Sequence, residues 1–280
     1  MIKVYGVIGD PISHSVSPDI HNDAFSRYNL NSFYHHFHVT PTKLEDAVKG
    51  MKAIGVRGFN VTIPHKTAII PHLDEVDETA RAIGAVNTVV NRNGRFVGYN
   101  TDGFGYLLAL KEEYNQSLDD KRILLIGAGG AARGIYCTLV KEGIANVDIA
   151  NRTVEKAKEL VNDCPYENHT RVFSIHEAET NLNQYDILIN TTPEGMSPHT
   201  ERMPLQLHKL KNDAFVSDII YNPLKTKLLE AAEQKQAMIQ NGLGMFAFQA
   251  ALAFEIWTGI FPEVERMKQI VLNKLGGTEC

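Results

Sequence analysis

Residues 123–135 read ILLIGAGGAARGI, an apolar run that ends in a glycine-rich turn. The run Ile123–Ile126 predicts a buried strand, and the apolar pattern after the turn predicts a helix that continues to about Lys141. The turn itself has a GxGxxA spacing, formed by Gly127, Gly129 and Ala132. A strand, a glycine turn and a helix in this order are the context in which such a spacing indicates a dinucleotide-binding unit.

The small residues of this turn have physical tasks in binding a dinucleotide. Gly127 allows the tight turn, Gly129 lets a pyrophosphate approach the backbone, and Ala132 lets the helix pack closely on the strand. The free N–H groups at the N-terminus of the helix then bind the phosphates. The residues of the turn predicted to contact the cofactor are Gly127, Ala128, Gly129, Gly130 and Ala131. A glycine turn without a ligand is the alternative.

The tip of the next predicted strand bears on the choice between NAD and NADP. An NAD site places a carboxylate there for the ribose 2′-hydroxyl, about 20 residues after the glycine turn. This chain has Asn151 at that position and Arg152 next to it. An arginine can bind a 2′-phosphate through paired N–H bonds, and Thr153 and Lys156 add a hydroxyl and a second cation. Thr153 could instead be only a helix cap, and Lys156 only a solvated charge. The pattern favours NADP.

Strands and helices alternate along the whole chain, which is typical of an α/β fold with mostly parallel sheets. We expect further strands at Val4–Ile8, Phe33–Val39, Phe59–Ile63, Thr88–Val90, Arg95–Gly98, Val147–Ala150, Ile187–Asn190 and Phe215–Ile219. We expect further helices that open at Ser17, run from Thr42 to about Ala53, span Asp74–Ile83, start at Val154 and span Gly244–Trp257.

Three local signals refine these elements. Ser17 is expected to cap its helix, with Pro18 at the first helical position. Thr42 and Glu45 have the spacing of a capping box. Asn93 and Gly94, between two β-rich runs, predict a hairpin with a type I′ turn.

Composition excludes several classes of protein. The 280 residues carry a net charge of −5 and no dense basic run, which argues against nucleic-acid binding. No apolar stretch approaches the length of a membrane span, and the first residues lack the layout of a signal peptide. The cysteines are Cys137, Cys164 and Cys280, without a CxxC spacing. We therefore expect reduced thiols in a cytoplasm and no metal site.

The stretch GFNVTIPHK, residues 58–66, places reactive side chains directly after a predicted strand. The alternation of Phe59, Val61 and Ile63 with polar residues is that of a half-buried strand. Ligands of open α/β sheets bind beyond the carboxyl ends of the strands, so Thr62 and Lys66 are predicted to face a crevice. A surface lysine in a turn is the plainer interpretation of Lys66.

Other polar residues of the same half, and one near the C-terminus, could join that crevice. Ser15 and Ser17 share one face if their segment is extended, although Ser17 could act only as a cap. Asn87 stands at a strand start, and Asp102 heads a helix that it could simply cap. Gln249 lies on the apolar face of the last long helix, where a buried amide needs a partner. It could be a core glutamine or a ligand-facing one.

At this point the chain resembles the shikimate dehydrogenase family over nearly all of its length. The motifs that carry the resemblance are GDPISHSVSP, GFNVTIPHK, GAVNT, YNTDG, GAGGAAR, NRT and NGLGMFAFQAA, in the order and spacing of the family. Several such motifs in register are far more specific than the glycine turn alone.

The resemblance implies NADP-dependent, reversible reduction of 3-dehydroshikimate to shikimate, on the pathway to chorismate and the aromatic amino acids. It also implies a substrate domain made of residues 1–102 and 241–280, and a Rossmann-type NADP domain made of residues 103–240. A small-molecule substrate is the expected partner, without nucleic acid or membrane, and the chain is expected to be a monomer or homodimer.

By the same resemblance, Lys66 and Asp102 are the catalytic pair, and the residues expected to hold the substrate are Ser15, Ser17, Thr62, Asn87, Tyr221 and Gln249. The residues expected at the cofactor besides the glycine turn are Asn151, Arg152, Thr153, Lys156, Ile219 and Gly242. Two of these depart from the family pattern. Ile219 stands where a methionine sometimes does, and Lys156 where an arginine often does, so Lys156 offers a phosphate only a point charge.

Two alternatives remain at this stage. A quinate/shikimate dehydrogenase that prefers NAD is disfavoured because no acid stands at Asn151. A non-catalytic NADP-binding sensor on the same fold is disfavoured because binding alone needs neither Lys66 nor Asp102.

Overall fold

The computed structural model describes residues 2–276 and divides into two compact units. The first unit contains the residues up to Thr101 and those from Gln249 onward, and the second unit is Asp102–Phe248. The predicted return of the C-terminal helices to the first part is therefore confirmed. Within residues 2–276, no helix has the length and apolarity needed to span a bilayer.

The first unit is built on a six-stranded sheet with the strand order β2-β1-β3-β5-β6-β4. Its strands are β1 (Lys3–Gly9), β2 (Ser32–His38), β3 (Gly58–Val61), β4 (Glu75–Val76), β5 (Thr88–Arg92) and β6 (Arg95–Tyr99). Its helices are α1 (Ser17–Arg27), α2 (Leu44–Ala53), α3 (His65–Ala68), α4 (Glu78–Ile83), the last part of α10 (Leu243–Thr258) and α11 (Val264–Lys274). Only β5 runs antiparallel to its neighbours.

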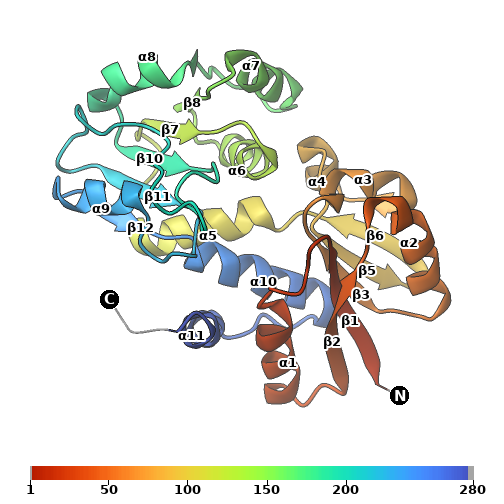
Figure 1. The fold of residues 1–280 in the computed structure, drawn as a ribbon. Coiled ribbons are helices and arrows are strands. Elements are labelled where there is room, and N and C mark those ends of the chain that lie inside the picture. The colour runs from red at the N-terminus through yellow and green to blue at the C-terminus, as the bar shows by residue number, and fades with distance from the viewer. Residues whose placement is uncertain (1, 277–280) are drawn as a thin grey trace. The chain divides into compact units, whose positions relative to one another are not determined.

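Helices cover both faces of this sheet, with α2 on one side and α1 with the end of α10 on the other (Figure 1). Strand alternation sorts the side chains, so Ile8 and Phe59 pack with α2. Tyr5 on the opposite face lies against Phe25 of α1 and Trp257 of α10, at ring centroid distances of 5.0 and 5.3 Å. Strand β1, helix α1 and the end of α10 thus share one buried layer.

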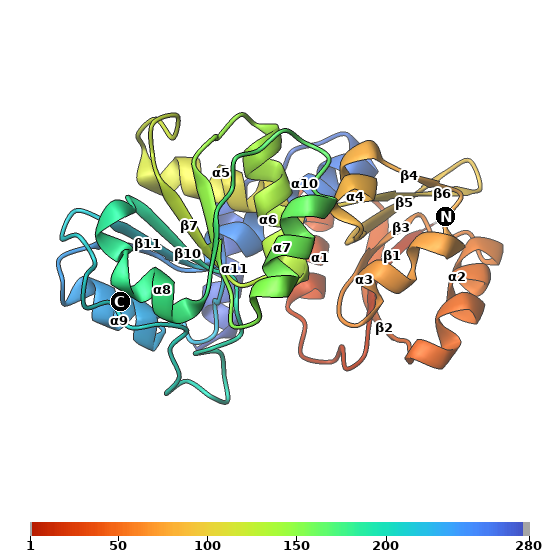
Figure 2. The same cartoon turned by 90° about the horizontal axis from the view of Figure 1, so that it is seen from above.

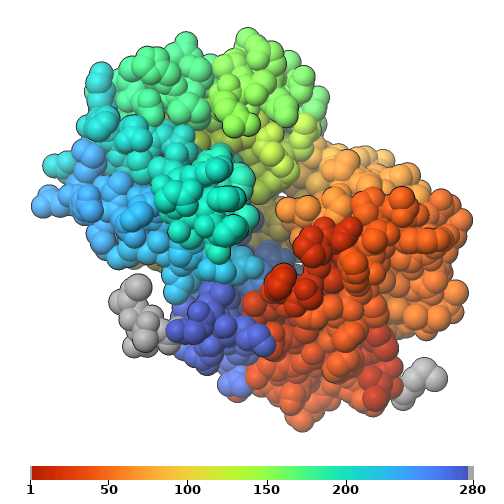
Figure 3. Space-filling model, viewed as in Figure 1, coloured from red at the N-terminus to blue at the C-terminus, as the bar shows by residue number. Residues whose placement is uncertain are grey.

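Helix α11 is held beside α1 by three ion pairs. These pairs are Arg27–Glu263, Asp23–Arg266 and Asp19–Lys274, with N–O distances of 2.7, 2.6 and 3.2 Å. In Figure 3 the dark blue atoms of α11 meet the red atoms of the first unit. The pairs are largely solvated, so each contributes about 1 kcal/mol or less.

The two predicted caps in this unit are wrong. Val16, not Ser17, holds the N-cap position of α1, and Ser17 is the first helical residue without a capping bond. Thr42 lies inside a 3₁₀ turn, Pro41–Lys43, so it cannot cap α2, and Glu45 instead accepts from Lys49 at 2.6 Å. Ser17 and Thr42 both have the sequence spacing of a helix cap. Neither acts as one, because the backbone already has helical geometry at the residue before each of them.

The predicted helix Asp74–Ile83 starts too early, whereas the hairpin is confirmed. Residues Glu75–Val76 form β4, which pairs with β6, and only then does Asp77 cap α4. At the hairpin, φ is 54° at Asn93 and 87° at Gly94, as a type I′ turn between β5 and β6 requires.

The second unit contains a six-stranded parallel sheet with the strand order β12-β11-β10-β7-β8-β9. Its strands are β7 (Ile123–Ile126), β8 (Val147–Ala150), β9 (Val172–Phe173), β10 (Ile187–Asn190), β11 (Phe215–Asp218) and β12 (Met238–Gln240). Its helices are α5 (Asp102–Tyr114), α6 (Gly130–Lys141), α7 (Val154–Asp163), α8 (Ile175–Thr180), α9 (Lys227–Glu233) and the first part of α10. The predicted α/β class with mostly parallel sheets is confirmed.

This second sheet is also covered on both faces. Leu124, Leu188 and Val216 pack with the buried residues of α8 and α9. On the other face Phe215 meets Tyr114 of α5, edge to face at 5.2 Å. Figure 2 shows α8 and α9 on one side of these strands and α5 with α6 on the other. A fully covered parallel sheet exposes mainly its strand ends, where loops can form a site.

Cys137 and Cys164 are buried free thiols, and Cys280 lies outside the described residues. Among residues 2–276, no cluster of histidine, cysteine and acidic side chains has the geometry of a metal site.

Candidate functional site

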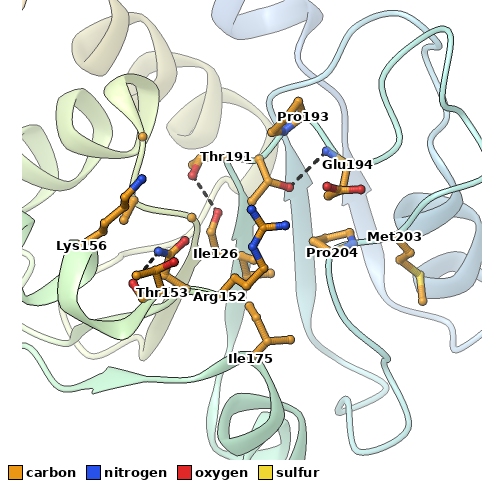
Figure 4. Close-up of a pocket in the computed structure, with 15 residues that line it drawn as sticks. Ile126, Arg152, Thr153, Lys156, Ile175, Thr191, Pro193, Glu194, Met203 and Pro204 are labelled. Atoms are coloured by element: carbon orange, nitrogen blue, oxygen red, sulfur yellow. Dashed lines mark hydrogen bonds between the residues drawn. The ribbon is translucent and has the colours of Figure 1, made fainter.

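A cavity of about 630 Å³ opens at the carboxyl ends of β7, β8 and β10 in the second unit (Figure 4). Its lining residues are Ile126, Gly127, Ala128, Gly129, Asn151, Arg152, Thr153, Lys156, Ile175, Thr191, Thr192, Pro193, Glu194, Met203 and Pro204. This is the edge of a doubly wound sheet at which ligands bind, and the volume suits a mononucleotide half of a cofactor.

The glycine turn has the conformation that the predicted task requires. Gly127 has a φ of 115°, in the left-handed region, and its N–H donates to Ala150 O at 2.8 Å. A Cβ atom there would lie 2.5 Å from Thr191 Oγ1, whereas a Cβ on Gly129 would meet no atom within 4 Å. Gly127 is therefore needed for the fold of the turn, and Gly129 leaves open space into which a phosphate can approach.

The end of β8 presents positive charge to the cavity. Arg152 reaches into its middle, with Thr153 and Lys156 to one side and Pro204 to the other (Figure 4). Within residues 2–276, neither Arg152 nor Lys156 forms an ion pair. Asn151 turns its Nδ2 to Thr153 O at 2.7 Å, so the tip holds no negative charge. Two cations without an acidic partner fit the 2′-phosphate of NADP.

Thr153 holds the N-cap position of α7, but its side chain forms no capping bond. Thr153 lines the cavity, and its hydroxyl does not close the helix end.

Four residues predicted at the cofactor do not line this cavity. Gly130 and Ala131 begin α6, behind the turn. Ile219 and Gly242 lie together beyond β11 and β12, where Gly242 N donates to Ile220 O at 2.9 Å and a Cβ on Gly242 would collide with Ile219 O. Their cofactor role stays a prediction.

Sequence reasoning missed one wall of the cavity. Thr191, Thr192, Pro193 and Glu194 follow β10 directly, and the Thr191 hydroxyl donates to Ile126 O at 2.7 Å. The signal was present, because a buried strand that ends in a polar segment marks a ligand edge in a parallel sheet. Met203 and Pro204 had no such signal, since only the folded loop brings them to the cavity.

In the first unit, four strand ends meet at one edge of the sheet. Strands β1 and β3 are parallel, with Ile8 opposite Val61. Strand β5 runs against β3 and β6, so Thr88 stands opposite both Asn60 and Tyr99. The predicted catalytic and substrate-binding residues that adjoin this edge are Ser15, Ser17, Thr62, Lys66 and Asn87. Residues from three separate segments are therefore brought to a common edge.

Hydrogen bonds join several of these side chains directly. Ser15 Oγ donates to Ser17 Oγ at 3.1 Å. Asn87 Nδ2 donates to Thr101 Oγ1 at 2.9 Å, and Thr101 Oγ1 donates to the backbone oxygen of Gln249 at 3.0 Å. The start of β5, the end of β6 and helix α10 thus converge at Thr101.

The segment that carries Lys66 is anchored by its neighbours. His65 is buried, and its Nε2 lies 2.6 Å from Val39 O. The backbone oxygen of Lys66 accepts from Val86 N at 2.8 Å. These contacts fix the turn from β3 into α3, so the role of His65 here is structural. Thr62 and Lys66 themselves are half-buried.

The remaining two predicted residues belong to the second unit. Asp102 is the first residue of α5, directly after Thr101, and is half-buried. Tyr221 follows β11, and its ring lies 4.8 Å from that of Phe246. Burial raises the pKa of the Tyr221 phenol, which therefore stays protonated at neutral pH.

Comparisons with known proteins show the family to which the chain is similar. Residues 7–89 match the shikimate dehydrogenase substrate binding domain, residues 109–223 match shikimate/quinate 5-dehydrogenase, and residues 242–272 match the shikimate 5′-dehydrogenase C-terminal domain. A shikimate dehydrogenase (NADP(+)) of Geobacillus sp. (strain WCH70) is 59% identical over 99% of this chain and 100% of its own.

Solved structures give the same result. A crystal structure of a shikimate dehydrogenase in complex with NADP+ superposes with a TM-score of 0.93 at 44% identity, covering 99% of this chain and 96% of that one. The shikimate 5-dehydrogenase of Thermus thermophilus, in complex with NADP(H) and shikimate, superposes with a TM-score of 0.87 at 32% identity, covering 98% and 99%. The chain belongs to the shikimate dehydrogenase family.

Proposed function

We propose that this chain catalyses the reversible, NADP-dependent reduction of 3-dehydroshikimate to shikimate, on the route to chorismate and the aromatic amino acids. The observation that carries the cofactor choice is the cavity at the end of β8, where Arg152 and Lys156 face a ligand space without an acidic partner in residues 2–276. Two relatives that are 59% and 57% identical are named shikimate dehydrogenase (NADP(+)), which supports the same reaction. We also infer a cytoplasmic monomer or homodimer.

The substrate would bind at the strand-end edge of the first unit. The hydroxyls of Ser15 and Ser17 lie 3.1 Å apart, a spacing that suits the two oxygens of a carboxylate. The residues proposed to hold the ring oxygens are Thr62, Lys66, Asn87, Asp102 and Gln249, with Tyr221 lining the pocket near the nicotinamide. Amide, hydroxyl and ammonium groups can each donate to a ring oxygen, which suits a polyhydroxylated ring.

The proposed chemistry depends on a proton donor at the reacting carbonyl. A dinucleotide held at the glycine turn and Arg152 would supply a hydride, and negative charge would then grow on the carbonyl oxygen. The Lys66 ammonium stabilises that charge and delivers the proton, while Asp102 orients the ammonium. The other polar residues hold the carbonyl in place, which lowers the entropic part of the barrier.

The test is an assay of the purified chain with shikimate or quinate against NADP or NAD, followed by the absorbance of the reduced nicotinamide. We expect strong turnover with shikimate and NADP, and weak turnover in the other three combinations. Comparable turnover with NAD or quinate would move the chain to the broader-specificity relatives.

The variant Lys66→Ala tests the role of the ammonium group in the same assay. Its turnover should fall by about 10³-fold, which is the order of a lost acid–base group, while NADP binding persists. Turnover that survives this change would disprove the role of Lys66. NADP binding without turnover in the unmodified chain would indicate a sensor instead.

A further inference from the structure

A cluster of buried polar side chains lies behind Asn87 in the first unit. Asn60, Asn87, Thr88 and Thr101 are all at least nine-tenths buried, and Thr88 is fully buried. Tyr34 Oη, also buried, donates to Asn60 Oδ1 at 2.8 Å. Buried polar groups are costly unless they are paired, so this cluster needs a structural or functional reason.

The directions of the bonds around the Asn87 amide follow from the groups that surround it. Asn60 Nδ2 donates to the Asn87 backbone oxygen and to Thr88 Oγ1, both at 3.1 Å. Because Thr88 Oγ1 accepts that bond, its single proton is available to Asn87 Oδ1, which lies 2.9 Å away. The backbone N–H of Thr101 donates to the same Asn87 oxygen at 2.8 Å.

These bonds settle which way the Asn87 amide faces. A backbone N–H can only donate, so the atom facing Thr101 N must be Oδ1, and the Thr88 hydroxyl reinforces this assignment. Nδ2 then faces Thr101 Oγ1, to which it donates at 2.9 Å. The amide is thereby held in one orientation by groups on β5 and on the segment after β6.

We propose that Thr88 is a positioning residue, which holds the Asn87 side chain in the orientation required to bind the substrate ring. The proposal rests on the role of Asn87 in the proposed function. Thr88 itself is fully buried, so it acts only through Asn87 and does not touch the substrate. Its hydroxyl has two tasks, since it accepts from Asn60 and donates to Asn87.

The first experiment compares Thr88→Val with Thr88→Ser in the shikimate and NADP assay. Valine keeps the branched shape and removes the hydroxyl, and serine keeps the hydroxyl. We expect kcat/KM for shikimate to fall about tenfold in Thr88→Val, the factor of one misplaced hydrogen bond, and to stay within about twofold in Thr88→Ser. KM for NADP should not change in either variant.

If Thr88→Val does not fold, the same comparison can be made between Thr88→Ser and Thr88→Ala, because serine and alanine differ only in the hydroxyl. A purely structural role would lower the midpoint of thermal unfolding without changing kcat/KM for shikimate in the folded variants. That result, or equal losses in the serine and hydroxyl-free variants, would overturn the proposal.

A double-mutant cycle with Asn87→Ala tests the route of the effect. If Thr88 acts through Asn87, Thr88→Val should cause less than about a twofold further loss in the Asn87→Ala background, where no amide remains to be oriented. A full tenfold loss in that background would refute the proposal. If Asn87→Ala alone left kcat/KM unchanged, the proposed role of Asn87 in substrate binding would be refuted. The cycle therefore distinguishes an error in the proposed function from an error in the role of Thr88.

Discussion

At the scale of single residues, Arg152 is the side chain best placed to set cofactor preference. Its guanidinium extends into the cavity of the second unit, where no acidic partner among residues 2–276 neutralises it. Arg152→Gln should raise the Kd for NADP by about 10- to 100-fold, because a charge-assisted bond to the 2′-phosphate is lost. The Kd for NAD should barely change. Titration calorimetry with both cofactors measures the two values.

Lys158→Gln is a matched control for Arg152→Gln, since it removes one positive charge from α7 outside the cavity. It should leave both Kd values unchanged. A similar loss of NADP affinity in this control, or an equal loss for NAD in Arg152→Gln, would contradict a specific phosphate contact.

His21 is a second residue with a clear physical consequence. It is fully buried, its ring stacks on Tyr34 at 4.6 Å, and within residues 2–276 neither ring nitrogen has a hydrogen-bond partner. Burial lowers the pKa of His21 to about 3, and the nearby Asn60 side chain offsets only part of this shift. The folded protein therefore keeps this imidazole neutral at any pH above about 3.

This lowered pKa predicts a loss of stability in acid. Between pH 6.5 and about 3 the unfolded chain binds a proton at His21 that the folded chain does not bind, so the free energy of unfolding falls as the pH falls. The full effect of His21 is about 5 kcal/mol below pH 3. Urea titrations at a series of pH values from 7 to about 4 measure the slope.

His21→Phe keeps an aromatic ring in the stack and removes the titration. Its free energy of unfolding should depend less on pH than that of the unmodified chain, whatever the variant costs at neutral pH. His208→Phe, at an exposed position, should leave the slope as it was. An unchanged slope in His21→Phe would mean that other groups cause the acid sensitivity.

At the scale of elements, the crossing of α5 and α6 depends on a glycine. A Cβ atom on Gly103 of α5 would collide with Thr138 Oγ1 and with the backbone oxygen of Gly134, both on α6. Gly103→Ala should therefore lower the free energy of unfolding by about 1–3 kcal/mol, the usual cost of overpacking. Thermal unfolding followed by calorimetry measures the change.

Gly50 of α2 is the matched comparison, because a Cβ there would meet no atom within 4 Å. Gly50→Ala should raise the free energy of unfolding by up to about 1 kcal/mol, since alanine loses less backbone entropy in a helix. If both variants changed stability in the same direction, close packing of α5 on α6 would not be the explanation.

The elements also show which local patterns can be read from sequence. The buried strands β7, β8 and β10 were predicted to the residue, because an apolar run bounded by turns has few alternatives. The caps at Ser17 and Thr42 were wrong because capping depends on the backbone before the cap residue. Strand β4 was missed because its only support is pairing with β6, a non-local contact without a local pattern.

At the scale of the whole molecule, the two sites differ in how much the sequence reveals. The glycine turn and the tip of β8 lie within one contiguous strand–helix series, so spacing and strand ends locate much of the cavity. The edge of the first sheet is assembled from the ends of four strands. Local position could suggest Ser15 and Asn87 as candidates, but only the resemblance to a family gave them a role. The buried support at Asn60 and Thr88 had no sequence signal, because it depends on strand register.

Trp257 is the only tryptophan of the chain, and it is packed into the first unit. Its indole Nε1 donates to Val89 O at 2.9 Å, and its ring covers Gly58, where a Cβ would lie 2.5 Å from the nitrogen. Intrinsic fluorescence therefore reports the packing of α10 on β3 and β5, whereas circular dichroism reports both sheets. In one denaturant titration, coincident midpoints from the two signals would mean that the units unfold together, and separate midpoints would resolve the stability of each.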